Sequence, residues 1–380
     1  MYMVEKSGKL LCRIVLIMLL FVLCFCASCG HKEARYALDM AEKRMWDEPD
    51  SALKVLESIV MPEDLEGKEL ADYALLLTQA QYRSNIVATS DSLINIAVGY
   101  YQDKDVEKRT ASLLYKGGVL KDMGKDEEAM LVYKEAESYI PRIKDNRIVT
   151  LIYMGLGYLN QKNRNYALSI DYFKKSVAVN IVPKQVLSWK VSSIMNLANI
   201  SYYWGNRDDA DLYYSQLLDM VPLVDSMLQT KIYYNYGIYK SKEKEWAEAE
   251  KYVRKALDNA SGDVSYRAML LLANLYSRTG RDGEVDSLCQ YALKTSEPAV
   301  KARIYYFLYE ENVARKEYED AVTYLSHYVL LSDTLRSQIN RSEYLEIQKK
   351  YDQLNPVHQN IINETIDAYL CKENKGTIIS

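Results

Sequence analysis

Residues able to carry acid–base, nucleophilic or metal chemistry form no recognisable constellation in this 380-residue sequence. The three histidines, His31, His327 and His358, have no cysteine or carboxylate at the spacing of a metal site or a catalytic triad. The sequence also contains no P-loop, no G-x-G-x-x-G dinucleotide motif and no H-E-x-x-H zinc motif. We therefore predict no catalytic residue, no metal site and no cofactor, and we expect that the protein is not an enzyme.

A thiol near the amino end suggests a different kind of chemistry. Three basic residues precede an unbroken apolar run over residues 14–26, and the small residues Ala27 and Ser28 then stand directly before Cys29. This order of segments is typical of a secretory signal peptide. The apolar run is shorter than the roughly 20 residues that a membrane-spanning helix needs. We therefore predict a signal peptide over residues 1–28.

The stretch Cys26–Cys29 resembles the bacterial lipobox, in which the thiol directly after the cleavage site receives lipid. It departs from that pattern at Cys26, where Leu is usual. The resemblance implies cleavage after Ser28 and lipidation of Cys29; a plain cleaved signal peptide and an uncleaved anchor are the alternatives. The expected location is the bacterial cell envelope, lipid-anchored and facing the periplasm.

The composition limits the other partners. The formal net charge is −4 and no basic stripe stands out, so we predict no nucleic-acid binding. Glycine and proline are scarce, at 15 and 7 residues, which suits long helices. At 380 residues the chain exceeds what one compact core usually organises, so we expect several domains or an elongated repeat.

The body of the chain repeats a pattern at intervals of 36 to 41 residues. In each copy a polar turn precedes a small residue, a second residue follows four positions later, and a third follows three positions after that. These spacings place all three side chains on one face of a helix. The six triplets are Ala129/Tyr133/Ala136, Ser169/Phe173/Ser176, Ala210/Tyr214/Leu217, Ala249/Val253/Ala256, Val285/Cys289/Ala292 and Ala321/Leu325/Tyr328.

Twelve positions before most of these triplets lies another small residue, which would let a preceding antiparallel helix approach closely. The residues are Gly117, Gly157, Ala198, Gly237 and Ala273. The combined pattern resembles the tetratricopeptide repeat, with its small residues at the eighth and twentieth positions and its aromatic at the twenty-fourth. The resemblance implies an all-α, right-handed α-solenoid of about eight tetratricopeptide-like helix pairs, whose stacking creates a continuous core.

The predicted organisation has five parts. They are the signal peptide 1–28, degenerate repeats over 29–108, the main array over 109–330, one long helix over 331–354 and a weakly ordered tail over 355–380. The long helix is expected to cap the last repeat, and its amphipathic pattern makes a dimer through this helix the alternative.

In modules similar to this one, the first helix of each pair lines the concave face and binds extended peptides. The free positions of those helices combine aromatic rings with amide and guanidinium groups. They are Tyr158, Asn199, Tyr202, Tyr203, Tyr234, Asn274, Arg278 and Tyr306. We predict that this set binds a protein or peptide, while the alternative is that each tyrosine packs between neighbouring first helices.

The function expected from these features is that of a membrane-tethered, non-catalytic scaffold. The segment over residues 341–352 resembles the helix that closes the sensor arrays of Bacteroidetes-type tetratricopeptide regulators. In those regulators a membrane span and an output domain follow, whereas residues 355–380 contain neither, so we expect a sensor ectodomain without its output domain. A glycan-binding outer-membrane lipoprotein and an outer-membrane assembly lipoprotein are the alternatives.

Overall fold

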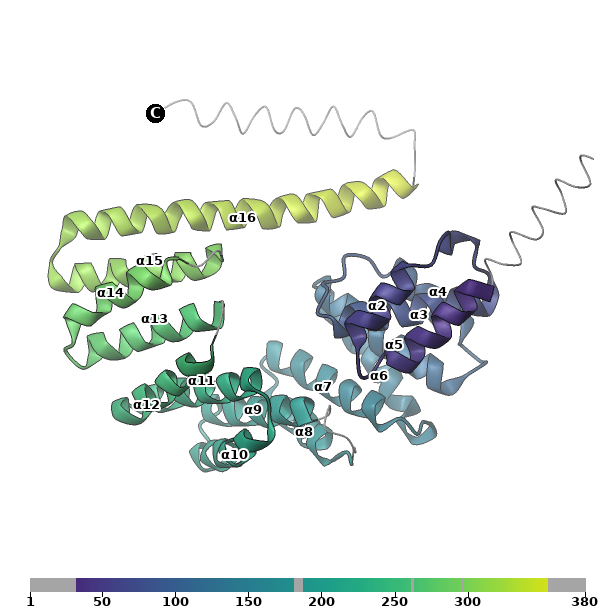
Figure 1. Ribbon diagram of the computed structural model, residues 1–380, viewed down its shortest axis with the longest axis horizontal. Helices are drawn as coiled ribbons and strands as arrows, with labels where there is room; N and C mark the ends of the chain where they lie inside the picture. The colour runs from purple at the N-terminus through teal and green to yellow at the C-terminus, as the bar shows by residue number, and fades with distance from the viewer. Residues whose placement is uncertain (1–31, 181–186, 261–262, 295–296, 355–380) are drawn as a thin grey trace, which may run out of the picture. The chain divides into compact units, whose positions relative to one another are not determined.

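The computed structural model describes residues 32–180, 187–260, 263–294 and 297–354 (Figure 1). Every regular element in these ranges is a helix, so the all-α prediction is confirmed. In this part of the chain, no helix combines the length and the apolar composition that crossing a membrane requires. The predicted signal peptide, Cys29 and the tail over 355–380 lie outside the described residues.

The chain divides into two compact units, and the first, residues 1–220, contains five helix pairs in its described part. Each pair consists of two sequential helices that pack on each other, the first through a shared hydrophobic cluster. The pairs are residues 32–44 with α2 (Pro49–Glu57), α3 (Gly67–Arg83) with α4 (Ser92–Tyr100), α5 (Val106–Asp122) with α6 (Asp126–Tyr139), α7 (Asn146–Lys162) with α8 (Tyr166–Ala178), and α9 (Leu187–Tyr203) with α10 (Arg207–Met220). Two 3₁₀ turns, η1 (Pro62–Asp64) and η2 (Ile140–Arg142), join successive pairs.

The second unit, residues 221–380, contains three helix pairs in its described part. It begins with the 3₁₀ turn η4 (Val221–Leu223). The pairs are α11 (Ser226–Lys242) with α12 (Trp246–Asn259), α13 (Asp263–Arg278) with α14 (Asp282–Ala292), and α15 (Pro298–Arg315) with α16 (Tyr318–Leu354). The total of eight pairs in the described residues agrees with the predicted number.

The two helices are joined by the same kind of turn in seven of the eight described pairs. One residue of each turn has left-handed backbone angles, and the next residue donates its N–H to the carbonyl five positions earlier. This is the Schellman arrangement, which ends a helix and satisfies its last carbonyls. The left-handed residues are Asn85, Gly124, Arg164, Gly205, Lys244, Gly280 and Lys316.

The predicted triplets form the core of each pair. All members of the first five triplets are buried, including the large rings of Tyr133, Phe173 and Tyr214. In the last triplet Ala321 is 2% exposed, while Leu325 is only half-buried. The prediction that the members of each triplet pack on one helical face is therefore confirmed. Burial is most complete in the five triplets that are followed by another helix pair.

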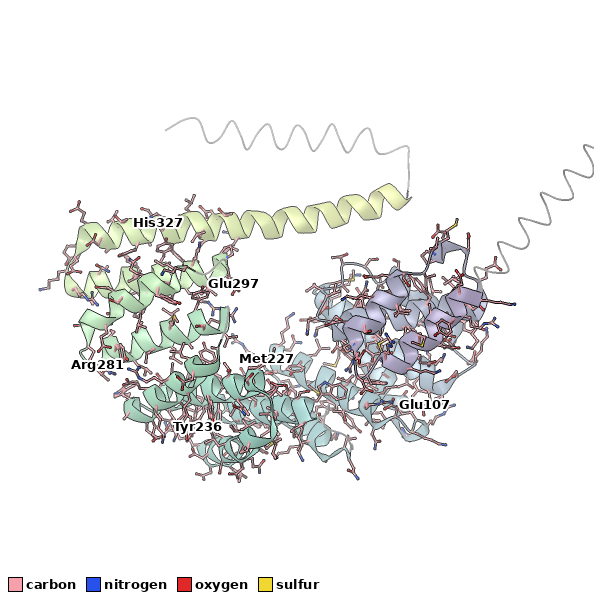
Figure 2. All side chains as sticks on the ribbon, viewed as in Figure 1. Glu107, Met227, Tyr236, Arg281, Glu297 and His327 are labelled. Carbon is pink, nitrogen blue, oxygen red and sulfur yellow. The ribbon has the colours of Figure 1, made fainter. Side chains whose placement is uncertain are left out.

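Tyrosines contribute to this thin core to different degrees: Tyr115 and Tyr133 are completely buried, whereas many others are only half-buried. In the second unit, Tyr236 of α11, labelled in Figure 2, meets Tyr252 of α12 edge to face, with centroids 4.6 Å apart. Lys240 and Lys255 lie 5.5 Å and 5.1 Å from these two rings, respectively. Tyrosine rings thus contribute to packing between the two helices of this pair, and the contact of Tyr82 with Tyr115 shows that they also pack between pairs.

The last helix begins earlier than predicted. The sequence analysis placed a separate helix over 331–354, but α16 runs without a break from Tyr318 to Leu354. The reason is that these 37 residues contain no glycine or proline to end a helix. The second helix of the last pair and the predicted capping helix are therefore one element, which packs on α15.

Candidate ligand-binding site

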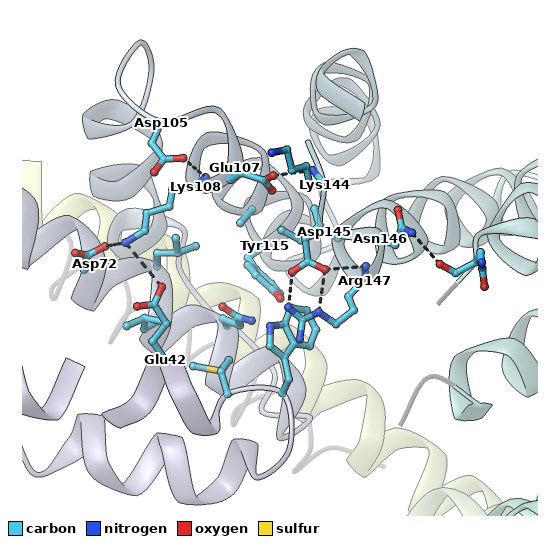
Figure 3. Close-up of a pocket in the computed structure, with 18 residues that line it drawn as sticks. Glu42, Asp72, Asp105, Glu107, Lys108, Tyr115, Lys144, Asp145, Asn146 and Arg147 are labelled. Carbon is cyan, nitrogen blue, oxygen red and sulfur yellow. Dashed lines mark hydrogen bonds and ion pairs between the residues drawn. The ribbon is translucent and has the colours of Figure 1, made fainter. Parts of the chain in front are cut away.

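The first helices of four successive pairs in the N-terminal unit enclose a cavity of about 680 Å³. This volume lies within the range of about 300–1,000 Å³ that ligand pockets occupy. The lining residues combine acidic, basic and aromatic side chains with an apolar floor (Figure 3). They are Glu42, Met45, Trp46, Asp72, Leu75, Leu76, Gln79, Asp105, Glu107, Lys108, Ala111, Tyr115, Lys144, Asp145, Asn146, Arg147, Ile148 and Asn180.

One wall of the cavity is an ionic cluster centred on Asp72. Its carboxylate accepts hydrogen bonds from Lys108, from Lys68 at 2.8 Å and from the hydroxyl of Tyr101. Burial raises the pKa of Asp72, but these three hydrogen bonds together hold that pKa below its usual value. The Lys108 ammonium also lies 4.0 Å from Glu42, the more exposed acid of this wall. This wall therefore pairs two ammonium groups, of Lys68 and Lys108, with the two carboxylates of Asp72 and Glu42, and Glu42 is its more exposed acid.

The opposite wall begins at the amino end of α7. The side chain of Asp145 caps this helix by accepting the N–H of Arg147 at 2.9 Å. The same carboxylate binds the Arg147 guanidinium at 2.7 and 2.8 Å. Arg147 in turn lies over the ring of Trp46, 4.2 Å from its centroid. Figure 3 shows Asp145 and Arg147 near Tyr115. The charge of Arg147 is therefore already neutralised by Asp145.

A group of aromatic and guanidinium side chains connects residues far apart in the sequence. The rings of Trp46 and Trp189 meet edge to face at 5.9 Å. The guanidinium of Arg83 lies over both rings, 4.6 Å from Trp46 and 5.6 Å from Trp189, and donates a hydrogen bond of 2.9 Å to the carbonyl of Trp46. The contact joins the end of the first helix, α3 and α9, which belong to the first, second and fifth pairs of this unit.

A second cavity, of about 580 Å³, lies against the same group. Arg83 and Trp189 line it, whereas their neighbour Trp46 lines the first cavity, so the two cavities adjoin at the Trp46–Arg83 contact. The remaining lining residues are mostly aromatic or aliphatic: Tyr82, Asn85, Ile86, Val87, Lys121, Asp122, Leu151, Met154, Tyr158 and Ser188. Burial raises the pKa of Tyr82 to about 12, so its hydroxyl stays neutral.

The comparisons with known proteins agree with this architecture. No family model matches the chain. The regulatory protein RapD of Bacillus subtilis is 24% identical over 273 residues, which cover 69% of this chain and 75% of RapD. The apo form of RapI is similar in structure with a TM-score of 0.62 at 13% identity, covering 91% of this chain and 99% of that one. NprR in complex with its cognate peptide NprX has a TM-score of 0.52 at 14% identity, covering 86% and 99%.

The fold is a tetratricopeptide-like helical repeat. At these identities the likeness shows the architecture alone. It confirms the helical solenoid that the six triplets predicted.

Four of the eight predicted site residues lie in the N-terminal unit. Tyr158 lines the second cavity, where its hydroxyl accepts a hydrogen bond from Asn196 at 3.2 Å. The Asn199 side chain accepts the Tyr214 hydroxyl at 2.6 Å, so it serves contacts within its own pair. The rings of Tyr202 and Tyr203 meet edge to face at 5.5 Å. Of these four, only Tyr158 borders a cavity described above.

The other four lie in the C-terminal unit. Tyr234 is half-buried against the core of that unit, and burial raises its pKa. Asn274 accepts a hydrogen bond of 3.3 Å from Arg278. Tyr306 is 41% exposed and packs near the ring of Tyr328. The eight positions are thus divided equally between two units, and their role as one collective site stays a prediction.

Sequence reasoning missed the aromatic and guanidinium group that lines the two cavities, namely Trp46, Arg83, Arg147 and Trp189. A signal did exist, because two of the four tryptophans of the chain fall at the end of one first helix and at the start of another. Tryptophan and arginine are the residue types most enriched at binding surfaces. Among the described residues, no group of three or more His, Cys, Asp or Glu side chains could hold a metal ion.

Proposed function

We propose that the protein is a non-catalytic scaffold that binds a peptide, or an extended segment of a protein, on the first helices of its N-terminal unit. The observation that carries this proposal is the cavity bordered by four of these helices. Its ionised walls and aromatic group are of the kind that recognises charged and apolar side chains of a peptide. The likeness to NprR, whose solved complex contains a cognate peptide, supports the same class of ligand.

The lining also favours a peptide over a smaller metabolite. Ion pairs hold Asp72 and Arg147 in place. Glu42 has a looser ion pair with Lys108, at 4.0 Å, and its side chain is 57% exposed at the rim, beside an apolar floor that includes Leu75 and Ala111. A ligand that alternates charged and apolar groups along its length matches this arrangement. RapD is described as a regulatory protein, which supports a role in regulation.

We further propose that lipid on Cys29 tethers this scaffold at the bacterial cell envelope. The support is the order of basic residues, apolar run and small residues before Cys29. In this proposal the tethered scaffold holds its ligand at the membrane surface and needs no metal ion or cofactor to bind it.

A charge reversal at the rim tests the site. Purified protein is incubated with a library of short random peptides, and the retained peptides are identified and their affinities measured. Glu42→Lys reverses a rim charge that lines the cavity, and Glu57→Lys makes the same change at an exposed position outside it. We expect Glu42→Lys to weaken binding of cationic peptides about tenfold, because it replaces attraction by repulsion, and Glu57→Lys to have no effect. Retention of no peptide from the library would contradict the proposal.

A further inference from the structure

Arg83 stands out among the cationic residues of the N-terminal unit because its geometry is fixed. It is the last residue of α3, and its guanidinium lies over the rings of Trp46 and Trp189. A hydrogen bond of 2.9 Å to the Trp46 carbonyl restrains the same group. A guanidinium held in this way loses little side-chain entropy when it binds a ligand.

The charge of Arg83 is not matched by an ion pair. Among the described residues no carboxylate forms a salt bridge with it, and its Nε is buried without a hydrogen-bond partner. Asp47 acts on it only through its charge at longer range. Arg147, on the same Trp46 ring, differs in that Asp145 binds it through two nitrogens. Of the two guanidinium groups on the Trp46 ring, that of Arg83 is therefore the one able to bind an additional anion.

The residues around Arg83 also determine which kind of anion the second cavity can bind. The second cavity contains one other cation, Lys121, among its described lining residues, and Asp122 lies 3.8 Å from that ammonium. The cavity thus offers about one positive charge, which suits a monoanion better than a phosphate. Leu151, Met154 and other apolar side chains form much of the rest of the wall. A planar anion attached to an apolar group fits this combination.

We infer that Arg83 binds a carboxylate of the peptide ligand in the second cavity, with the neighbouring apolar side chains of the ligand packed against Leu151 and Met154. This inference rests on the proposed function, because it assigns one end of the proposed ligand. The planar guanidinium can donate two parallel hydrogen bonds to a carboxylate. Burial lowers the pKa of Arg83, and the charge of Arg147 lowers it further, so a bound carboxylate would relieve an existing electrostatic cost.

Peptide pools that differ only in their carboxylates test the inference. The first pool contains short random peptides that are acetylated, lack Asp and Glu, and end in a free carboxylate. The second contains the same sequences as carboxamides, and the third contains carboxamides that include Asp and Glu. The full-length protein is equilibrated with each pool, and retained peptides are quantified by mass spectrometry. The third pool distinguishes a side-chain carboxylate from a chain terminus.

Three variants accompany the wild type. Arg83→Gln removes the charge, and Arg83→Lys keeps the charge but loses the planar pair of donors. Arg142→Gln is the matched control, because Arg142 also lies over an aromatic ring, 5.6 Å from the centroid of Tyr139, but lines neither cavity. The acid–amide comparison on the wild type shows whether a carboxylate is recognised even if Arg83→Gln folds poorly, and the milder Arg83→Lys then tests whether Arg83 is the residue that recognises it.

We expect the wild type and Arg142→Gln to retain a carboxylate pool about tenfold better than the pool without carboxylates. Arg83→Gln should lose this preference and Arg83→Lys should keep part of it. Equal retention of all three pools by the wild type, or an unchanged preference in Arg83→Gln, would overturn the carboxylate inference while leaving peptide binding intact. Retention of no peptide from any pool would overturn both proposals.

Discussion

The ring of Tyr133 lies directly against the backbone of Gly155, so that a Cβ placed on Gly155 would stand 2.6 Å from its Cζ. A Cβ on Gly117 would stand 2.8 Å from the same ring. Tyr133 belongs to α6, whereas the two glycines belong to α5 and α7. One fully buried ring therefore fixes the spacing of two successive pairs, and both glycines are needed because of the space it occupies.

Replacing Gly155 by Ala should destabilise the N-terminal unit. The added methyl group would force the buried ring of Tyr133 out of place, and overpacking of this kind costs about 1–3 kcal/mol. Gly99→Ala is the matched control, because Gly99 is also helical but has no atom within 4 Å of an added Cβ. That change should be neutral or stabilise by up to about 1 kcal/mol. Urea unfolding of both variants gives the two free energies, and equal values would show that Tyr133 can move freely.

The sequence was sufficient to predict the repeat because its evidence is local. Residues such as Ala129, Tyr133 and Ala136 repeat at helical spacing, and the structure buries all three. The contact of Trp46 with Trp189 could not be predicted in the same way. It joins two residues in different pairs, and it depends on small rotations that accumulate from one pair to the next.

The turns give a second prediction, which concerns backbone strain. Arg164 has a φ of +58° in the turn between α7 and α8, where the equivalent turn between α5 and α6 uses Gly124. A left-handed conformation costs a residue with a Cβ about 1–2 kcal/mol relative to glycine. Arg164→Gly should therefore raise the free energy of unfolding by about 1 kcal/mol, as measured by urea denaturation. The reciprocal change, Gly124→Arg, should lower it, and a stabilising effect of both changes would refute this explanation.

Acid should weaken the C-terminal unit through Glu250. Arg281, at the turn between α13 and α14 (Figure 2), donates to this carboxylate at 2.5 Å, and Arg254 donates at 2.9 Å. These bonds, that of Arg281 first, lower the pKa of Glu250 from 4.5 to about 2. Because the folded pKa is depressed, the stabilisation is present above about pH 4.5 and is lost as the pH falls towards about 2.

A comparison of two variants tests this pH dependence. Glu250→Gln should lower the free energy of unfolding by on the order of 1 kcal/mol near neutral pH, a modest value because solvent screens the pair. The difference from the wild type should shrink as the pH approaches the folded pKa. Glu248→Gln is the control, since Glu248 bonds Lys251 on the exposed surface of the same helix. An effect of Glu250→Gln that is the same at all pH values would indicate a packing role instead.

The proposed membrane tether predicts that one particular thiol carries the lipid. The residue before the cleavage site must be small, and Ser28 precedes Cys29 whereas the bulky Phe25 precedes Cys26. In cells fed a labelled fatty acid, the wild type and Cys26→Ala should therefore incorporate label and sediment with membranes. Cys29→Ala should lose the label, and with it the acyl chains whose burial holds the protein at the bilayer. Labelled, membrane-bound Cys29→Ala would refute the assignment, because the lipid would then have to reside on another residue.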